Sequence, residues 1–167
     1  MIDDAIAAVA ERVLDACRTR GLKVATAESC TGGLVAAALT EIPGSSDVVD
    51  RGFVTYSDAA KQAMLRVPAS VLESHGAVSR ETADAMARGA LAMSGADIAV
   101  AITGIAGPAG GSAEKPIGLV HFAAAARDGR SIRREKRFGD IGRSAVRMHS
   151  VAEALALIEL LAIDARI

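Results

Sequence analysis

Aromatic side chains are nearly missing from this sequence of 167 residues. They make up 2% of the chain, with no Trp, one Tyr and three Phe. Proteins that bind single-stranded nucleic acids stack the bases on such side chains, so we do not expect a protein of this class. An excess of charge of one sign is also lacking, because 19 Lys and Arg stand against 20 Asp and Glu. The near-neutral balance gives no general support for nucleic-acid binding.

Cysteine and histidine are scarce as well. Cys17 and Cys30 make no disulfide framework, so we expect a reducing, cytoplasmic location. His75, His121 and His149 are scattered along the chain, and no H-E-x-x-H motif or Cys/His cluster is present. The sequence therefore gives little support to a metal site, and we expect structural roles for the three histidines.

Long hydrophobic runs are missing too. The most apolar stretch, 96–105, is far short of the ~20 residues that a membrane-spanning helix needs. The first residues are acidic and lead directly into an amphipathic pattern, so no signal peptide is expected. The chain is 51% hydrophobic and 23% charged, which is typical of a globular protein. Its length suggests one domain over residues 1–167.

What the chain does contain is an alternation of helix and strand patterns. Apolar residues at helical spacing predict a first helix that ends near Gly21. Further helices are expected from residue 34 and over 58–65, 68–73, 79–93 and 143–163, and strands over 22–27, 48–55, 97–103, 117–125 and 132–138. The last strand is charged, follows an Asp-Gly turn and is expected near a sheet edge. This order predicts an α/β protein, a three-layer α/β/α sandwich around a mixed sheet.

The first candidate for chemistry is the segment T-A-E-S-C-T-G-G at residues 26–33, between a strand and a helix. Ser29 could act as a nucleophile there, with the free N–H groups of the helix start stabilising an oxyanion. Gly32 and Gly33 would let a substrate approach the backbone closely. Spacing alone favours a different interpretation, in which Ser29 is the N-cap of the helix.

Cys30 is a rival nucleophile, because a thiol at a helix start has a lowered pKa. The alternative is a small, buried, apolar residue. We favour the alternative, since the side chain next to Ser29 should point elsewhere if Ser29 faces a cleft.

The second candidate is the loop over 104–116, G-I-A-G-P-A-G-G-S-A-E-K-P, which follows a buried strand, as ligand-binding loops do in α/β proteins. Its spacing is not that of a dinucleotide fingerprint, and Lys115 precedes Pro116 rather than a helix, so it is not a P-loop. Backbone N–H groups and Lys115 could still hold a phosphate. The alternative is a flexible surface loop.

The third candidate is Y-S-D-A-A-K at residues 56–61. Most lysines are solvated, which is the ordinary interpretation of Lys61. If Lys61 were partly buried near Ser29, desolvation would lower its pKa and its amine could accept the serine proton. Basic residues also cluster over 127–147, where the ordinary interpretation is a solvated edge strand. Arg143, at a loop-to-helix junction, is the candidate for a phosphate contact.

Four ordered segments together resemble the C-terminal domain of the competence/damage-inducible CinA proteins: T-A-E-S-C-T-G-G, R-G-F-V-T-Y-S-D-A-A-K, H-G-A-V-S and T-G-I-A-G-P-A-G-G-S-A-E-K-P-I-G. The resemblance covers nearly the whole chain. Larger members carry an extra N-terminal domain, for which this chain has no room, so the stand-alone form is expected. Stand-alone members are nicotinamide-nucleotide amidases. The resemblance thus implies metal-independent and cofactor-independent hydrolysis of the carboxamide of nicotinamide mononucleotide, giving nicotinate mononucleotide and ammonia in pyridine nucleotide recycling.

The resemblance also implies roles for particular residues. Ser29 would be the nucleophile, Lys61 the general base, and Tyr56 a residue that relays or orients the proton. The pair is not an S-x-x-K motif, so the two residues must meet through the fold. The expected substrate-binding residues are Cys30, Thr31, Gly32, Gly33, Thr103, Gly104, Gly107, Gly110, Gly111, Lys115 and Arg143.

An alternative function keeps the same glycine loop but leaves Lys61 in solvent. The protein would then be a non-catalytic nucleotide-binding or regulatory module. In either case the expected partner is a small-molecule nucleotide, without nucleic acid or membrane. An alanine-rich chain with apolar helices also favours a homo-oligomer, a dimer or higher.

Overall fold

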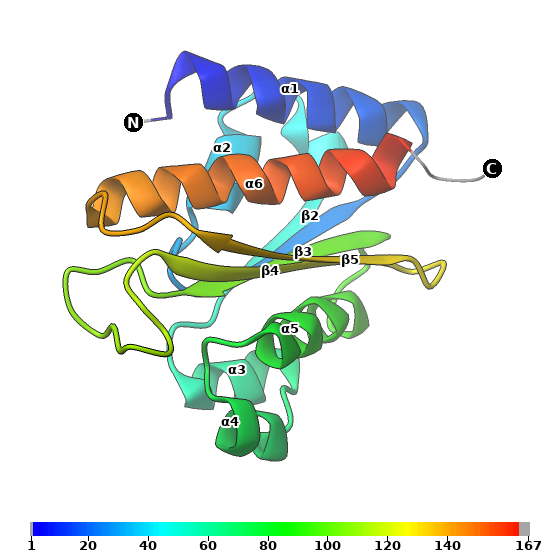
Figure 1. Ribbon diagram of the computed structural model, residues 1–167. Coiled ribbons are helices and arrows are strands. Elements are labelled where there is room, and N and C mark those ends of the chain that lie inside the picture. Colours follow the sequence, from blue (N-terminus) through cyan, green and yellow to red (C-terminus); the bar gives the residue numbers. More distant parts are fainter. Residues whose placement is uncertain (1, 164–167) are drawn as a thin grey trace.

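A mixed five-stranded sheet lies at the centre of the computed structural model, which describes residues 2–163 (Figure 1). Its strands, in the spatial order β2-β1-β3-β4-β5, are β1 (Val24–Glu28), β2 (Val49–Val54), β3 (Ile98–Gly104), β4 (Leu119–Ala126) and β5 (Ser131–Arg137). β1 pairs in parallel with β2 and β3, whereas β4 and β5 continue the sheet in antiparallel pairing. β1 is therefore enclosed on both sides, and the charged strand β5 lies at an edge, as expected.

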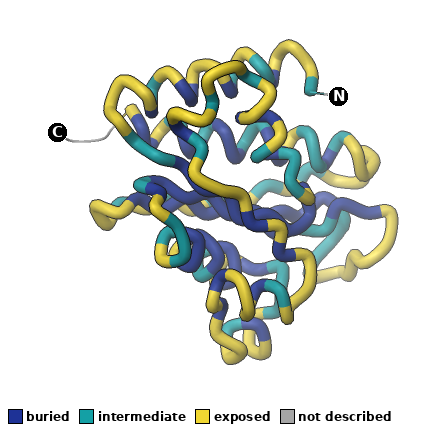
Figure 2. The backbone as a smooth tube through the Cα atoms, turned by 180° about the vertical axis from the view of Figure 1, so that it is seen from behind, coloured by how far each residue is buried: buried dark blue, intermediate teal, exposed yellow. Residues whose placement is uncertain are grey.

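Two layers of helices cover this sheet, which is buried between them (Figure 2). One face carries α1 (Asp4–Thr19), α2 (Leu34–Thr40) and α6 (Arg143–Ile163), and the other carries α3 (Asp58–Leu65), α4 (Ala69–His75) and α5 (Arg80–Ala92) (Figure 1). A short 3₁₀ helix, Ser45–Asp47, precedes β2. The arrangement confirms the three-layer α/β/α sandwich. No helix within residues 2–163 is long and apolar enough to cross a membrane.

Side-chain size differs between the two faces of the central strands. Towards α1 and α6, β3 presents larger side chains, such as Val100 and Ile102. Towards α5, β1, β3 and β4 present alanines. Alanine lets α5 approach the sheet closely, and α5 itself has Gly89 where a Cβ atom would lie 1.9 Å from the Leu65 carbonyl oxygen. The alanine and glycine content thus serves close packing in this layer.

Helix starts follow local capping. The hydroxyl of Ser57 accepts the Ala60 N–H at the start of α3, and the hydroxyl of Ser79 accepts the Thr82 N–H at the start of α5. Some expected boundaries shift by two residues: β1 begins at Val24 rather than at residue 22, and β4 begins at Leu119 rather than at residue 117. Ile117 instead packs inside the preceding loop, against Gly107 and Gly111.

Candidate active site

Ser29 lies directly after β1, at the carboxyl end of a strand that has a neighbour on each side. Its N–H donates to the Ile102 carbonyl at 3.0 Å, and its own carbonyl accepts the Gly32 N–H at 3.0 Å. The residue is 9% exposed. Two main-chain hydrogen bonds therefore hold this serine at the carboxyl end of an inner strand of the sheet.

Lys61 is buried beside this serine. Its Nζ lies 3.2 Å from Ser29 Oγ and donates to the Thr55 carbonyl at 2.9 Å, and the residue is 1% exposed. The two residues are 32 positions apart in the chain. They meet because β2 pairs with β1 and leads into α3, which carries Lys61. The ordinary interpretation of Lys61 as a solvated lysine is therefore wrong. The non-catalytic alternative also placed Lys61 in solvent, and this part of it is wrong as well.

Burial lowers the pKa of this lysine. Desolvation lowers the pKa of Lys61 from its ordinary value of 10.5, and the nearby charge of Asp58 opposes the shift. A lowered pKa increases the fraction of neutral amine, which has the lone pair that a general base requires. A buried amine next to a hydroxyl can therefore remove the hydroxyl proton.

Cys30 points away from this pair, into the core beneath α1 and α6. Burial raises the pKa of its thiol to about 12. Because the thiolate is the nucleophilic form, such a thiol is unreactive near neutral pH. The expectation that Cys30 is a small buried residue is confirmed.

Glu28 is a residue of this region to which the sequence analysis gave no role. Its buried carboxylate accepts the N–H groups of Gly33 at 3.0 Å, Val35 at 3.1 Å and Ala36 at 2.9 Å. It also accepts the Thr26 hydroxyl at 3.1 Å. The interpretation of Ser29 as the N-cap of α2 is therefore wrong, since the carboxylate from β1 binds these N–H groups. An acidic residue immediately before a glycine turn and a helix is the signal that could have revealed it.

This capping changes the expected oxyanion site. The N–H of Gly33 is bound by Glu28, and the N–H of Gly32 by the Ser29 carbonyl. Within residues 2–163, the N–H groups of Cys30 and Thr31 make no hydrogen bond with another residue. The turn therefore offers the N–H groups of Cys30 and Thr31 as donors. The N–H groups at the start of α2 are already bound by Glu28.

Replacing Glu28 with glutamine should destabilise the protein. The amide lacks the negative charge and turns an NH₂ group toward backbone donors, so at least one buried N–H loses its acceptor. We expect a loss of about 2–3 kcal/mol in the free energy of unfolding, measured by urea denaturation. The matched control is Glu41→Gln, at the exposed end of the same helix, which should cost little. Equal stability of both variants would contradict the capping role.

Tyr56 and Arg143 lie at the surface of the site. Arg143 donates from Nη2 to the Tyr56 hydroxyl at 2.9 Å and from Nη1 to the Gly107 carbonyl at 2.8 Å. It thus connects the segment after β2 with the glycine-rich loop. Tyr56 is 59% exposed, and its hydroxyl makes no hydrogen bond with Ser29 or Lys61. The expected proton relay through Tyr56 therefore stays a prediction.

The glycine-rich loop is held in place by packing and by two side chains. A Cβ atom at Gly104 would lie 2.7 Å from Val120, and one at Gly107 or Gly111 would lie 2.8 or 2.9 Å from Ile117. Close packing therefore requires glycine at these three positions, whether or not they contact the substrate. Gly110 has a φ of +91°, which favours glycine at that position.

The end of β3 and the loop after it are bonded to α4 and to the segment that follows α4. Thr103, in β3, donates from its hydroxyl to the Ala77 carbonyl, and Lys115, in the loop, donates from Nζ to the His75 carbonyl, each at 2.7 Å. Lys115, His75 and His121 line a hollow of about 560 Å³ at the end of α4 and the start of α5. The structure thus places Lys115 against α4, with no hydrogen bond to Ser29 or Lys61.

Most of the basic cluster serves the structure. Arg127 donates to carbonyls at the end of α5, Arg133 pairs with Asp84, and Arg134 pairs with Glu153. Arg147 is different, because it donates to the carbonyls of Cys30 and Thr31, next to the nucleophile. The sequence analysis counted it only as part of the cluster. Its position four residues after Arg143, on the same helix face, was the available signal.

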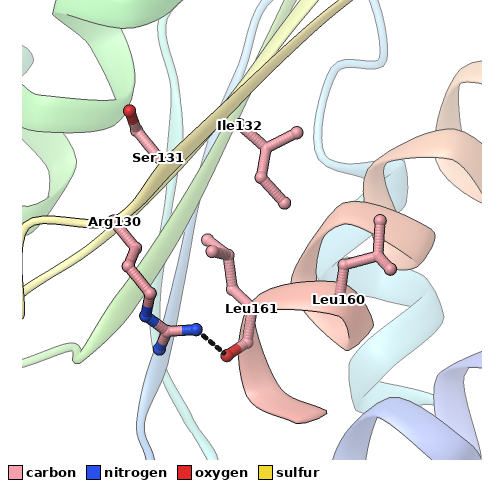
Figure 3. Close-up of a pocket in the computed structure, with 5 residues that line it drawn as sticks. All are labelled: Arg130, Ser131, Ile132, Leu160 and Leu161. Carbon is pink, nitrogen blue, oxygen red and sulfur yellow. Dashed lines mark hydrogen bonds between the residues drawn. The ribbon is translucent and has the colours of Figure 1, made fainter. Parts of the chain in front are cut away.

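Another hollow, of about 460 Å³, lies between β5 and the end of α6 (Figure 3). Its lining is mainly aliphatic, and Arg130 donates across it to the Leu161 carbonyl at 3.1 Å. It contains no pair of nucleophile and base. Within residues 2–163, no group of three or more His, Cys, Asp or Glu side chains could hold a metal ion. The Ser29–Lys61 pair is thus the candidate catalytic centre.

Known proteins include sequences similar to most of this chain. A family model described as the CinA C-terminal domain matches residues 6–162. The nicotinamide-nucleotide amidohydrolase PncC of Escherichia coli K12 is 51% identical over 156 residues, which are 93% of each chain. The PncC protein of Enterobacter agglomerans is 52% identical over 84% of this chain and 85% of its own length. A CinA-like protein of Synechococcus sp. RCC307 is 52% identical over 95% of this chain, which spans 37% of that relative.

Solved structures are similar as well. The competence/damage inducible protein CihA of Agrobacterium tumefaciens superposes with a TM-score of 0.95 at 55% identity, covering 96% of this chain and 98% of that one. The competence damage-inducible protein A of Klebsiella pneumoniae MGH 78578 gives a TM-score of 0.91 at 38% identity, covering 96% and 99%.

Proposed function

This chain belongs to the CinA C-terminal domain family, and from that premise we propose that it is a nicotinamide-nucleotide amidohydrolase. Its substrate is nicotinamide mononucleotide, and its products are nicotinate mononucleotide and ammonia, in pyridine nucleotide recycling. The observation that carries the proposal is the buried Lys61 amine 3.2 Å from the Ser29 hydroxyl. Relatives that bear this activity in their names are 51–52% identical, and this chain covers 85–93% of their length.

Acylation comes first in the mechanism. The neutral amine of Lys61 takes the proton from Ser29 Oγ as this oxygen bonds to the carboxamide carbon. The carbonyl oxygen becomes an oxyanion, which the N–H groups of Cys30 and Thr31 stabilise. The C–N bond then breaks, and the Lys61 ammonium gives its proton to the departing ammonia. Serine is left esterified to the nicotinoyl group.

Deacylation follows the same path with water as the nucleophile. Lys61 takes a proton from water as the water oxygen bonds to the ester carbon, and returns a proton to Ser29 Oγ as the ester bond breaks. The product acid loses its remaining proton to solvent and is released as a carboxylate. The one amine serves both acylation and deacylation, so the proposed reaction requires no metal.

The nucleotide part of the substrate needs a separate contact. Arg143 is exposed and its guanidinium already connects Tyr56 with Gly107, so it lies where the glycine-rich loop meets the site. A guanidinium is well suited to a phosphate group, and this role of Arg143 is part of the proposal. The other expected substrate-binding residues stay predictions.

The free, buried thiols of Cys17 and Cys30 fit a reducing compartment, and we propose that the protein acts in the cytoplasm. Self-association also stays a prediction. Exposed apolar side chains, among them Val54 and Ile141, give it some support, and light scattering on the purified protein tests it.

The proposed activity has a direct assay. We expect purified protein to release ammonia from nicotinamide mononucleotide at the same rate with and without a strong chelator, because the amine replaces a metal-bound base. Ammonia and nicotinate mononucleotide should appear in equal amounts. Binding of the nucleotide in calorimetry without any product after long incubation would instead support a non-catalytic module. Loss of turnover in chelator would contradict the metal-independent mechanism.

A further inference from the structure

We propose that Arg147 is a positioning residue that aims the Thr31 N–H at the oxyanion and strengthens it as a donor. The inference rests on the proposed function, since it concerns the acyl-transfer step at Ser29. Arg147 comes from α6, on the face of the sheet opposite to α3 and its Lys61 (Figure 1). It therefore acts through the backbone of the turn rather than on the reacting atoms.

The contacts of Arg147 are concentrated on this turn. Its Nε donates to the Cys30 carbonyl at 3.1 Å, and its Nη2 donates to the Thr31 carbonyl at 3.0 Å. The residue is half-buried, and no Asp or Glu oxygen among residues 2–163 pairs with it within 4.0 Å. Its positive charge thus lies against two carbonyl groups and forms no ion pair within that distance.

Peptide geometry and these contacts together determine where the Thr31 N–H points. The Cys30 carbonyl and the Thr31 N–H belong to one trans peptide group, so they point in opposite directions. Because α6 holds the carbonyl, the N–H points away from α6, to the side where α3 carries Lys61. The neighbouring peptide is held similarly, since the Gly32 N–H donates to the Ser29 carbonyl and the Cys30 N–H makes no hydrogen bond with another described residue.

Charge adds to this effect. A guanidinium bound to a carbonyl oxygen polarises the peptide group and makes its N–H a stronger donor. The gain is largest when full negative charge develops on the substrate oxygen, which happens in the transition state. Arg147 should therefore raise kcat and leave KM nearly unchanged.

The test compares Arg147→Met and Arg147→Lys with the wild type in the ammonia assay. Removing an oxyanion donor outright costs roughly 10²–10³ in kcat, so loosening one should lower kcat by about 10- to 100-fold in Arg147→Met. KM should change by no more than about twofold, because ground-state binding is spared. Arg147→Lys should recover part of the loss, since it restores the charge but has one donor centre. The pH at which kcat rises should not move, because Arg147 does not contact Lys61.

A second measurement, covalent labelling of Ser29, does not use the nucleotide. It also separates a slower reaction from a smaller fraction of folded protein. A simple alkyl fluorophosphonate reacts as Ser29 Oγ bonds to phosphorus, fluoride leaves and Lys61 takes the serine proton. The labelling rate reports the oxyanion donors, and the final stoichiometry by intact mass counts the folded sites. We expect a slower rate at unchanged stoichiometry in Arg147→Met. The matched control, Arg12→Met, removes a surface arginine that pairs with Glu159 and should label normally.

The outcomes separate the two proposals. Wild-type kcat and labelling rate in Arg147→Met would overturn the positioning role, as would a raised KM with unchanged kcat, which would indicate a substrate contact. A wild-type protein that is labelled at Ser29 in an Arg147-dependent way, but releases no ammonia from the nucleotide, would contradict the proposed substrate while supporting this inference.

Discussion

Ser29→Ala should lower ammonia release from nicotinamide mononucleotide by about 10⁴-fold or more, because it removes the atom that forms the covalent intermediate. Losses of this size are usual when a serine nucleophile is deleted, and the remaining rate reflects substrate binding and oxyanion stabilisation. The hydroxyl makes no other hydrogen bond than the one with Lys61 among the described residues, so the fold should survive. Initial rates of ammonia release, with circular dichroism to check the fold, measure the effect.

A matched control for this variant is Ser70→Ala, an exposed serine on α4 that should have wild-type rates. The rival nucleophile is tested by alkylation. Since burial raises the pKa of Cys30 to about 12, iodoacetamide should not modify it in the folded protein. Retained turnover in Ser29→Ala would exclude Ser29 as the nucleophile, and rapid alkylation of Cys30 in the folded protein would contradict its unreactive state.

Lys61→Ala should lower kcat by roughly 10³- to 10⁴-fold, because no other base lies within hydrogen-bonding distance of Ser29 in the described part of the chain. Lys61→Arg should not restore activity, since a guanidinium stays protonated and has no lone pair to offer. Lys136→Ala, which removes a surface lysine paired with Glu153, is the matched control and should be fully active. Substantial activity in Lys61→Arg would point to a purely electrostatic role.

The pH dependence of the wild type follows from the same amine. Below its pKa, Lys61 is protonated and cannot accept the serine proton, so kcat/KM should rise tenfold per pH unit. Above its pKa the profile should become level. Because burial lowers the pKa of Lys61 from 10.5, the levelling should occur below pH 10.5. A rise that continues up to pH 10.5 would contradict the desolvated state of the amine.

Several features of the fold could be predicted from the sequence. The alternation of periodic and apolar segments indicated the α/β class and the approximate positions of α3 and α5. These features are local or nearly so, because they depend on neighbouring residues along one element.

The interpretation of single polar residues was less successful for the same reason. Glu28 and Ser29 are adjacent, and spacing alone made the serine the cap of α2. The structure gives that role to Glu28, because alternation along β1 turns this carboxylate toward α2 and the next side chain toward α3. The resemblance to a family identified Ser29 and Lys61 as a pair, but it assigned nothing to Glu28 or Arg147.

By itself, the sequence determined the class of fold and the identity of the segments that carry chemistry. Only the tertiary structure decided that the Lys61 amine reaches the Ser29 hydroxyl, that Glu28 occupies the start of α2, and that Arg147 holds the turn from the opposite face. The physical reason is that periodicity reports which side of an element is buried. Which elements become neighbours depends on the order β2-β1-β3 in the sheet, and this order is set by packing between segments far apart in the chain.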